Sequence, residues 1–452
     1  MSAWSSLDPR ATDAWADFTA SGGEAAGATG TAAAAADAER FQARLHRPGW
    51  VHMYPPPVLH KAAAEEVAEV GVRLAELVTA FPRRVFGDDL GAWAAYLGIP
   101  AENAELMAEA LRHPRTGRAA TAVMRPDLVV TDDGLKLVEL NVSTPMGGLS
   151  TLAPYTAATL DSAFGRFLAG RGLTPGGPAT SRIWLDMLAG LVRVPADRPL
   201  RVFEAIANPA DIDSGRRFFV DMIRSGGYEI SCGLIADLEL TDEGVFFEGE
   251  RIDAVVTMYT WHETKNHVPP ALTRRLMELD RALKVDFIGA PATALYDNKA
   301  NLALFSEPEF EALLTGEERA LVRAHVPPTF RLRAGTLDRA VAGREELICK
   351  PASAYGGKDM AFGFASDDAA WRALMAERLA DPRERYVLQR RLRPAVVVLP
   401  GANPPGREMV LAPLVFGGRY AGTFLRQAPP RPESTINASS GAEAAAVLTF
   451  AE

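Results

Sequence analysis

The 452-residue chain contains only two cysteines, Cys232 and Cys349, and they lie far apart in the sequence. Such sparse cysteine argues against a disulfide scaffold and fits a reducing compartment. No uninterrupted apolar stretch approaches the roughly 20 residues that cross a bilayer. The first residues, MSAWSSLDPRATDAWADF, carry acids where a signal peptide has basic residues. We therefore expect a cytoplasmic protein with no membrane partner.

Positive charge is also scarce, because 48 lysines and arginines stand against 57 acidic residues and leave a net charge of −9. This balance provides no large basic surface for nucleic acid, so cationic groups can gather only in a local pocket. A length of 452 residues implies two or three domains. The hydrophobic fraction of 48% is that of an ordinary globular protein.

Several functional motifs are absent. Without a G-x-x-x-x-G-K-[ST] sequence the P-loop scaffold is excluded, and without a G-x-G-x-x-G after the strand near Phe203 a nicotinamide or flavin enzyme gets little support. A zinc hydrolase is disfavoured too. In WHETKNH, His262 and His267 are five residues apart, about 140° around a helix, whereas zincins place two histidines four residues apart.

The sequence patterns divide the chain into unlike parts. The Ala/Gly-rich stretch 20–39 predicts a loose linker and then the start of a helix, and residues 61–81 have the apolar periodicity of a long helix. Strands alternate with helices between residues 199 and 290, which predicts βαβ units and a parallel sheet. Later, Gly417-Gly418 predicts the two-residue turn of a hairpin.

We therefore predict a fold that combines α/β and α+β parts. Its predicted domains are a helical N-terminal region (1–120), a hairpin segment (121–155), a Rossmann-like domain (156–295) and a nucleotide-binding domain (296–452). Within the last, YDNKANLALF predicts a helix, ELICKPASAYGG a strand that enters a glycine loop, and RYVLQRRL a further strand.

The stretch MRPDLVVTDDGLKLVELN has two apolar runs around a turn signal. If residues 132–134 form a three-residue loop with Gly134 in the left-handed conformation, Thr131 pairs with Leu135. A two-residue Asp-Gly turn is the alternative, and it would move Asp127 to the opposite face from Glu139. We predict the three-residue loop.

With that loop, Asp127 lies opposite Glu139 and Arg125 lies opposite Asn141 on one face of the hairpin. Two carboxylates at this distance repel each other unless a cation or a proton lies between them. Carboxylate and amide oxygens suit Mg²⁺, which commonly shares its coordination with substrate phosphates. The alternative is a solvated hairpin face on which Arg125 neutralises Asp127.

A second set of residues offers donors for phosphates. Lys350 ends a strand in ICKPASAYGGKDM and precedes a small loop that contains Ser353, Gly356, Gly357 and Lys358. Glycines allow backbone N–H groups to approach phosphate oxygens. An ordinary strand–turn–strand and a solvated Lys299 are the alternatives. Arg426 and Asn437 border apolar strands, and a guanidinium can grip a transferring phosphoryl group.

Taken together, these blocks resemble the circularly permuted ATP-grasp ligases, and the glutathionylspermidine synthetase-like branch in particular. The resemblance consists of R-x-D and E-x-N followed by S-T-P, a lysine after D-N, K-P-x-x-x-x-G-G, a strand that ends in Gln, and a late Arg before N-x-x-S-G-A, scattered over residues 121–450. The E-x-N block precedes the two lysines here, which is the permuted order. The glycine loop is less glycine-rich than in that branch, and the amidase part has no counterpart, so the glutathione and spermidine substrates are not carried over.

The resemblance implies a role for each matching residue, with ATP and Mg²⁺ as cofactors. It assigns Mg²⁺ to Asp127, Glu139 and Asn141, the phosphates to Lys299, Lys350 and the loop 353–358, the adenine to the surroundings of Gln389, the transferred phosphoryl group to Arg426, and the acyl phosphate to Arg125. Ser143, Thr144, Asn437 and the loop 208–216 are candidate substrate contacts.

The expected function is therefore an ATP-dependent ligase that joins a small carboxylate to an amine, such as an amino acid or a peptide-like compound, through an acyl phosphate. Positioning and charge neutralisation do most of the work in phosphoryl transfer, so no catalytic cysteine or zinc cluster is required. A small-molecule kinase on the same fold and a non-catalytic nucleotide-binding module are the alternatives. We expect no nucleic-acid partner, and a homodimer is left open.

Overall fold

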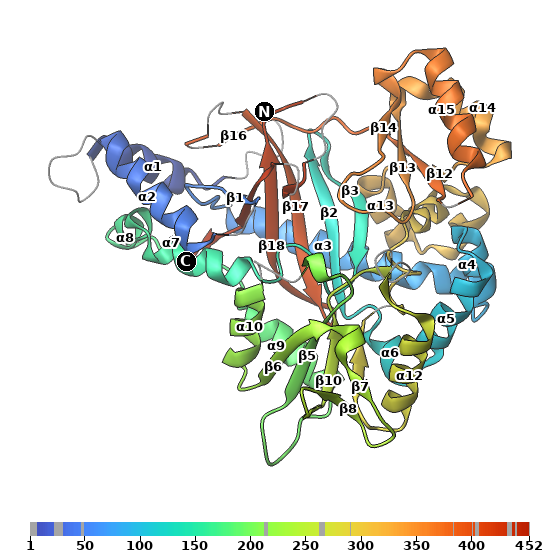
Figure 1. The fold of residues 1–452 in the computed structure, drawn as a ribbon. Helices are drawn as coiled ribbons and strands as arrows, with labels where there is room; N and C mark the ends of the chain where they lie inside the picture. The colour runs from blue at the N-terminus through green and yellow to red at the C-terminus, as the bar shows by residue number, and fades with distance from the viewer. Residues whose placement is uncertain are drawn as a thin grey trace.

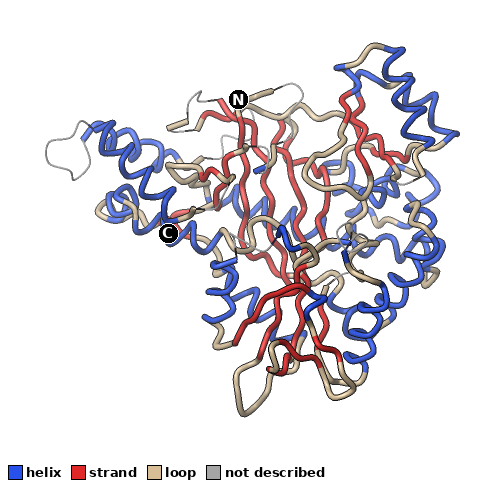
Figure 2. Tube along the Cα trace, in the orientation of Figure 1, coloured by secondary structure: helices blue, strands red, loops and turns tan. Residues whose placement is uncertain are grey.

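The computed structural model describes residues 7–21, 30–46, 49–211, 216–261, 267–289, 291–382, 384–399, 401–402, 406–431, 436–438 and 441–451. It is a mixed α/β structure with several sheets, arranged as Figures 1 and 2 show. Three of the predicted features, namely the linker at 22–29, His262 and part of the 208–216 loop, lie outside the described residues. Among the helices of the described part, none combines the length and the apolar character that crossing a membrane requires.

A seven-stranded sheet forms the centre of the molecule (Figure 1). Its main path runs in the order β1 (Val51–His52), β19 (Glu443–Ala446), β18 (Arg419–Ala428), β17 (Gly406–Phe416), β2 (Val123–Thr131) and β3 (Gly134–Val142), and β16 (Val397–Val398) pairs with β17. Strands from the two ends of the chain thus share one sheet. The hairpin between β17 and β18 turns at Gly417-Gly418, both with positive φ, as predicted.

The helices of the N-terminal region are α1 (Pro9–Ser21), α2 (Gly30–Arg44), α3 (Lys61–Phe86), α4 (Leu90–Leu97), α5 (Ala101–Arg112) and α6 (Pro114–Ala119). α3 packs on the back of the central sheet, α1 and α2 lie on its β1 side, and α4, α5 and α6 lie on the opposite side, beyond β3 (Figure 1). The predicted long helix is confirmed as α3. It approaches β17 so closely that a Cβ on Gly71 would lie 2.3 Å from Cγ of Pro413, so this position requires glycine.

The β2–β3 hairpin differs from its prediction at the turn. Thr131 pairs with Gly134, so the loop has two residues, Asp132 and Asp133, instead of three. An extra residue, Val138, then bulges from β3 between the pairs Leu128–Leu137 and Asp127–Glu139. The bulge restores the register that the shorter turn would have lost. The predicted pairs Asp127–Glu139 and Arg125–Asn141 are therefore correct although the predicted loop is wrong.

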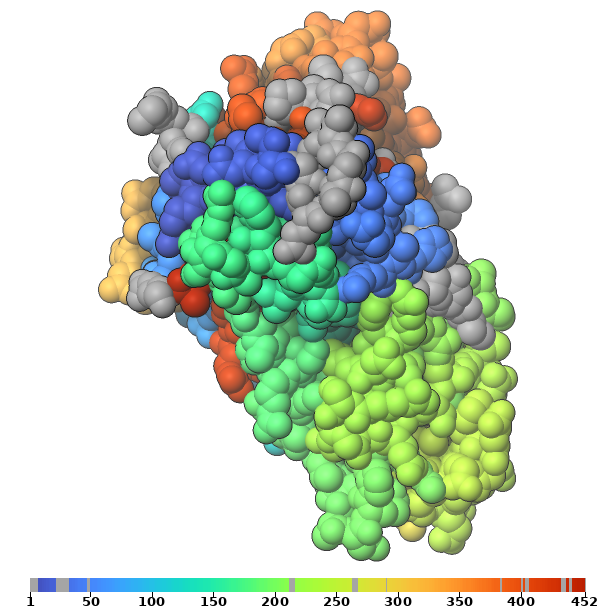
Figure 3. All heavy atoms as spheres, turned by 90° about the vertical axis from the view of Figure 1, so that its left-hand side faces the viewer, coloured from blue at the N-terminus to red at the C-terminus, as the bar shows by residue number. Residues whose placement is uncertain are grey.

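The predicted parallel sheet is confirmed in the lower lobe of Figure 1. Its order is β11 (Asp286–Ile288), β10 (Ala254–Thr257), β5 (Arg201–Ile206) and β6 (Glu229–Leu234). The helices of this part of the chain are α7 (Leu152–Asp161), α8 (Ala163–Ala169), α9 (Thr180–Leu191), α10 (Arg216–Ser225) and α12 (Pro270–Arg281). Small strands add β7 (Glu239–Leu240), β8 (Val245–Phe247) and β9 (Glu250–Ile252), and β4 (Pro175–Gly176) pairs with β20 (Thr449–Phe450). Figure 3 shows this lobe extending below the N-terminal helices.

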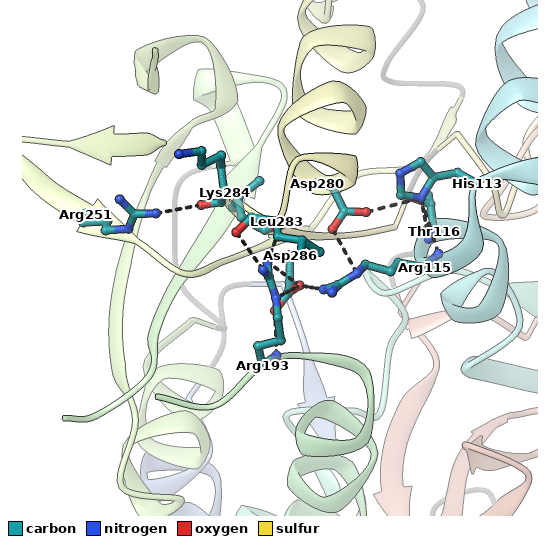
Figure 4. Close-up of polar contacts among 10 residues, drawn as sticks. His113, Arg115, Thr116, Arg193, Arg251, Asp280, Leu283, Lys284 and Asp286 are labelled. Atoms are coloured by element: carbon teal, nitrogen blue, oxygen red, sulfur yellow. Dashed lines mark hydrogen bonds and ion pairs between the residues drawn. The ribbon is translucent and has the colours of Figure 1, made fainter. Parts of the chain in front are cut away.

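A network of charged residues ties this lobe to the N-terminal helices (Figure 4). Nδ1 of His113, which precedes α6, lies 3.3 Å from Oδ2 of Asp280 in α12. Arg115 and Arg193 both bind the carboxylate of Asp286 on β11. Burial raises the pKa of Asp280 to about 6. The network therefore joins three separate segments around buried carboxylates.

A four-stranded antiparallel sheet lies beside the β3 edge of the central sheet (Figures 1 and 2). Its order is β12 (Thr329–Arg331), β15 (Tyr386–Arg390), β13 (Leu347–Pro351) and β14 (Ala361–Phe362), and the nearby helices are α13 (Gly316–His325), α14 (Leu337–Ala342) and α15 (Asp368–Ala380). Trp371 and Met375 of α15 fill its core. The helix predicted at YDNKANLALF is confirmed, and it is a 3₁₀ helix, η3 (Lys299–Ser306).

Candidate functional site: a basic cavity between two sheets

A cavity of about 580 Å³ lies between the central sheet and the small antiparallel sheet. The central sheet contributes side chains from β2, β3, β17 and β18, and the small sheet contributes side chains from β13, β14 and β15. The loop after β13 and the chain after β15 close its sides. Two sheets that converge in this way leave a slot lined by the residues that each strand points inward.

The cavity is strongly basic in an acidic protein. Eight basic side chains line it against three acidic ones, which leaves a surplus of five positive charges in a chain whose net charge is −9. The basic residues are Lys299, Lys350, Lys358, Arg390, Arg391, Arg393, Arg426 and Arg431. The acidic ones are Asp127, Glu139 and Glu408. A concentration of one sign of charge in a cleft attracts a multiply charged anion.

Asp127 is held between two guanidinium groups. Arg125 donates to it from Nε at 2.9 Å and from Nη2 at 3.2 Å, and Nη2 of Arg426 lies 2.6 Å from its Oδ2. Burial alone would raise the pKa of Asp127, but the two arginines outweigh burial and hold this pKa well below its usual range. Asp127 is therefore an anion at any physiological pH.

Glu139 and Lys299 meet across the cavity. Nζ of Lys299 lies 3.3 Å from Oε2 of Glu139 and also donates to the carbonyl oxygen of Ala354 at 2.6 Å. The Glu139 side chain keeps 26% of its surface exposed, so it remains open to a ligand. Lys299 thus links the acidic hairpin to the glycine-containing loop after β13.

Like Arg426, Lys350 is deeply buried at the cavity wall. Its Nζ donates to Oε1 of Gln389 at 2.6 Å and lies 3.5 Å from the carbonyl oxygen of the bulge residue Val138. Burial lowers the pKa of Lys350 to about 8, although the negative charges of Glu139 and Asp127 oppose that effect. The bulge therefore presents a carbonyl group to the lysine as well as restoring the hairpin register.

The structure brings most of the predicted site residues together. Ten of them line the cavity: Asp127, Glu139, Lys299, Lys350, Gly356, Gly357, Lys358, Gln389, Arg426 and Asn437. They come from segments up to about 300 residues apart in the sequence, so only the fold can assemble them.

Five predicted residues are not part of the cavity lining. Arg125 and Asn141 lie next to it on the hairpin, where Nδ2 of Asn141 donates to the carbonyl oxygen of Arg125. Ser143 and Thr144 are buried, and the Thr144 hydroxyl donates to the carbonyl oxygen of Thr257. Ser353 points to the other side of its loop, where its hydroxyl donates to Oε2 of Glu384 at 2.5 Å.

The sequence did not lead us to predict five charged residues of the cavity, three of which follow Gln389 in the chain. Arg390, Arg391, Arg393 and Arg431 all line the cavity, and so does Glu408 on β17. The signal was present as the QRRLR run at the end of a strand, but a charge run at such a place is most often a solvated edge.

Two residues of the predicted metal set meet the needs of Mg²⁺. Asp127 and Glu139 are paired across the hairpin and both line the cavity, which gives two carboxylates of the type that Mg²⁺ prefers. Oδ2 of Asp127 faces both Arg125 and Arg426, but within the described residues Oδ1 accepts only from Nε of Arg125, so its second lone pair retains capacity for a metal. The two carboxylates therefore fit the ion, while Asn141 lies outside the cavity lining.

Comparisons with known proteins add little. No protein-family model and no curated protein match this sequence. Among solved structures, the chain is similar to a candidate gamma-glutamylcysteine synthetase from Methylobacillus flagellatus KT, with 11% sequence identity, a TM-score of 0.46, and coverage of 80% of this chain and 87% of that one. A similarity at this level carries no functional information, so any assignment of function rests on the cavity itself.

Proposed function

We propose that the protein is an ATP-dependent ligase of the circularly permuted ATP-grasp type, which joins a carboxylate to an amine and releases ADP and phosphate. One observation carries the proposal. Two lysines from one side of the cavity, Lys299 and Lys350, face two carboxylates from the other, Asp127 and Glu139, inside a cavity with five surplus positive charges. A nucleoside triphosphate with its metal supplies the complementary charges.

The lining also suits the base of a nucleotide. Ile348, Met360, Phe362 and Leu392 provide apolar surface on the side of the small sheet. Opposite them, Val129 and Val410 provide apolar surface from the central sheet. A flat purine between two apolar walls buries both of its faces, and the neighbouring backbone of residues 390–393 can bind its edge.

In this proposal each charged residue has a separate task. Lys299 and Lys350 bind and neutralise the phosphates, and Arg426 stabilises the phosphoryl group during transfer. Mg²⁺, held by Asp127 and Glu139, supplies further charge neutralisation when it is bound. Arg125, which donates to the carbonyl oxygen of Gly147 at 3.0 Å, would contact the acyl phosphate.

The proposed reaction has two steps. A carboxylate oxygen of the acid attacks the γ-phosphorus of ATP, and the bond between this phosphorus and the oxygen that bridges it to the β-phosphorus breaks. ADP departs with that oxygen, and the acid is now an acyl phosphate. The nitrogen of an amine then attacks the acyl carbon, its proton is lost, and phosphate leaves to give an amide. Both steps depend mainly on positioning and on neutralising negative charge, and the cavity offers that environment.

The test is ADP release measured against a matrix of carboxylic acids and amines, with mass spectrometry of the products. A ligase requires both partners for multiple turnovers and forms an amide. ADP release with a hydroxyl compound alone would instead identify a kinase, and nucleotide binding without any turnover would identify a binding module.

A variant of the acidic hairpin provides the second arm of the test. Glu139→Ala should reduce ADP release by at least 100-fold, while Glu377→Ala, an exposed acidic residue of α15 outside the cavity, should leave it unchanged. Undiminished turnover in Glu139→Ala contradicts the proposed site.

A further inference from the structure

A second pocket of about 190 Å³ lies behind the loop that follows β13. Ala354 and Gly356 of this loop face the basic cavity, whereas Ser353 and Tyr355 face the second pocket. The loop is therefore a wall shared by the two cavities. In contrast to the first, the second pocket is acidic, since Asp297 and Glu384 line it together with one arginine, Arg385.

The carboxylate of Asp297 is buried against this wall, and its hydrogen-bond partners are neutral, while the charge of Lys299 acts on it only at longer range. The residue is 7% exposed, its Oδ1 accepts from the backbone N–H of Val142 at 3.0 Å, and its Oδ2 accepts from the Tyr355 hydroxyl. No ion pair joins Asp297 to any residue in the part of the chain that the structure describes. A buried carboxylate without a counter-ion is costly, and proteins normally pair such a group with a cation.

Glu384, which is half-buried, also lacks an ion pair in the described part of the chain. It accepts from the hydroxyl of Ser353 at 2.5 Å and from the backbone N–H of Arg385 at 2.9 Å, and within the described residues it has no ion-pair partner. The Arg385 guanidinium is directed to backbone carbonyl oxygens, those of Asp381 and of Glu384 itself. Two carboxylates in one small pocket thus have no ion-pair partner among the described residues.

We infer that this pocket binds the ammonium group of the amine substrate, with Asp297 as the main contact. The inference rests on the proposed ligase function and names the class of its second substrate. On binding, the ammonium displaces the Tyr355 hydroxyl from Asp297 and supplies the missing positive charge. Tyr355 and Trp261 also line the pocket, and aromatic rings attract an ammonium.

The position of Asp297 connects the pocket to the reaction site. Val142, its hydrogen-bond partner, follows Asn141 on β3, and Lys299 is two residues further along the chain and faces the basic cavity. An ammonium held at Asp297 is therefore next to the loop behind which the acid would be phosphorylated. It can pass one proton to the Asp297 carboxylate, and the free amine so formed is the species that moves past the loop and attacks the acyl carbon. A volume of 190 Å³ corresponds to roughly six water molecules, which limits the occupant to a small aliphatic amine or the amine end of an amino acid derivative.

The first test measures binding without nucleotide, by isothermal titration or saturation-transfer NMR, with n-butylamine as probe and 1-butanol as its uncharged counterpart. The wild type should bind the amine and not the alcohol. Asp297→Asn should weaken amine binding at least tenfold, Glu384→Gln should weaken it several-fold, and Tyr355→Phe should strengthen it because the competing hydroxyl is gone. Glu377→Gln is the matched control and should behave as the wild type.

Three results overturn the inference in this test. They are equal binding of amine and alcohol, unchanged amine binding in both Asp297→Asn and Glu384→Gln, and displacement of the amine by Mg²⁺ alone, which would identify a metal site. Because Tyr355→Phe is expected to change affinity in the opposite direction, a general loss of structure cannot imitate the expected pattern.

The second test separates this inference from the ligase proposal. Hydroxylamine is largely uncharged at neutral pH and traps an acyl phosphate as a hydroxamate without needing an ammonium pocket. In Asp297→Asn, amide formation should fall at least tenfold more than hydroxamate formation, with the loss mainly in the KM for the amine. An equal fall in both contradicts the inference. If the wild type forms no hydroxamate with any acid, the ligase proposal is contradicted. The butylamine titration then still shows whether the second pocket binds an ammonium group.

Discussion

Replacing Lys350 by methionine tests the central feature of the basic cavity, a cation that the fold buries in advance of its ligand. In the nucleotide-free protein, burial lowers the pKa of Lys350 from 10.5 to about 8. In the unfolded chain the Lys350 ammonium keeps its ordinary pKa of 10.5. Between about pH 8 and 10.5 the unfolded state therefore binds more protons than the folded state. The stability of the wild type should therefore rise with pH in that window.

The size of the effect follows from the shift. Each pKa unit corresponds to about 1.4 kcal/mol, so the wild type should gain about 2 kcal/mol between pH 8 and 9.5 relative to Lys350→Met. Urea unfolding of the nucleotide-free proteins, followed by tryptophan fluorescence, measures this difference. All other titratable groups are the same in the two proteins, so their contributions cancel when the free energies of unfolding are subtracted at each pH. Lys358→Met removes an exposed lysine of the same cavity but keeps Lys350, so the wild type should show no such gain relative to Lys358→Met.

The affinity for ATP should change with pH in the opposite direction to the stability. Phosphates stabilise the protonated lysine, so ATP affinity of the wild type should fall up to tenfold per pH unit above about pH 8. At pH 7 the loss of a charged hydrogen bond worth about 1.5–3 kcal/mol predicts that Lys350→Met binds ATP roughly 10- to 150-fold more weakly. Titration with a fluorescent ATP analogue checks both. A pH-independent affinity in the wild type, or an unchanged affinity in Lys350→Met, would refute the assignment of Lys350 to the phosphates.

Three further predictions concern other parts of the molecule. Gly71→Ala should destabilise the protein by about 1–3 kcal/mol in urea unfolding because its methyl group meets Pro413, whereas Gly190→Ala on an open face of α9 should be neutral or gain up to about 1 kcal/mol. Because burial raises the pKa of Asp280 to about 6, stability should fall as pH rises from about 4 to 6, and Asp280→Asn should flatten that slope. Asp127→Asn should reduce the magnesium dependence of ATP binding, measured by titration at several Mg²⁺ concentrations, and an unaltered dependence would remove Asp127 from the metal site.

The acidic hairpin shows how far the sequence could predict the site. The alternation of apolar and polar residues put Asp127 and Glu139 on one face, and that is where the structure has them. The turn was predicted one residue too long, and a bulge at Val138 was not foreseen. The two errors cancel because each moves the register by one residue. A bulge has no strong sequence signature when its residue is a valine, so local patterns cannot locate it.

Other parts could not be predicted because they depend on contacts between distant segments. β2 pairs with β17 across nearly 300 residues, and no local pattern indicates that pairing. The same holds for the direction of Ser353, which an alternating loop turns toward Glu384 instead of the cavity. The arginines after Gln389 resemble a solvated edge until the two sheets are placed on either side of them.

Three groups that the fold leaves poorly compensated lie around the two cavities, and this supports a shared role in ligand binding. Lys350 is a buried cation whose pKa is lowered, Asp297 is a buried carboxylate whose pKa burial raises to about 6, and Nε of Arg426 is buried without a hydrogen-bond partner among the described residues. Each is a cost in the free protein. A polyphosphate would relieve the two cations, and an ammonium would relieve the carboxylate. Ligands of opposite charge, bound on either side of the loop between residues 353 and 358, should therefore stabilise the protein together by more than either does alone.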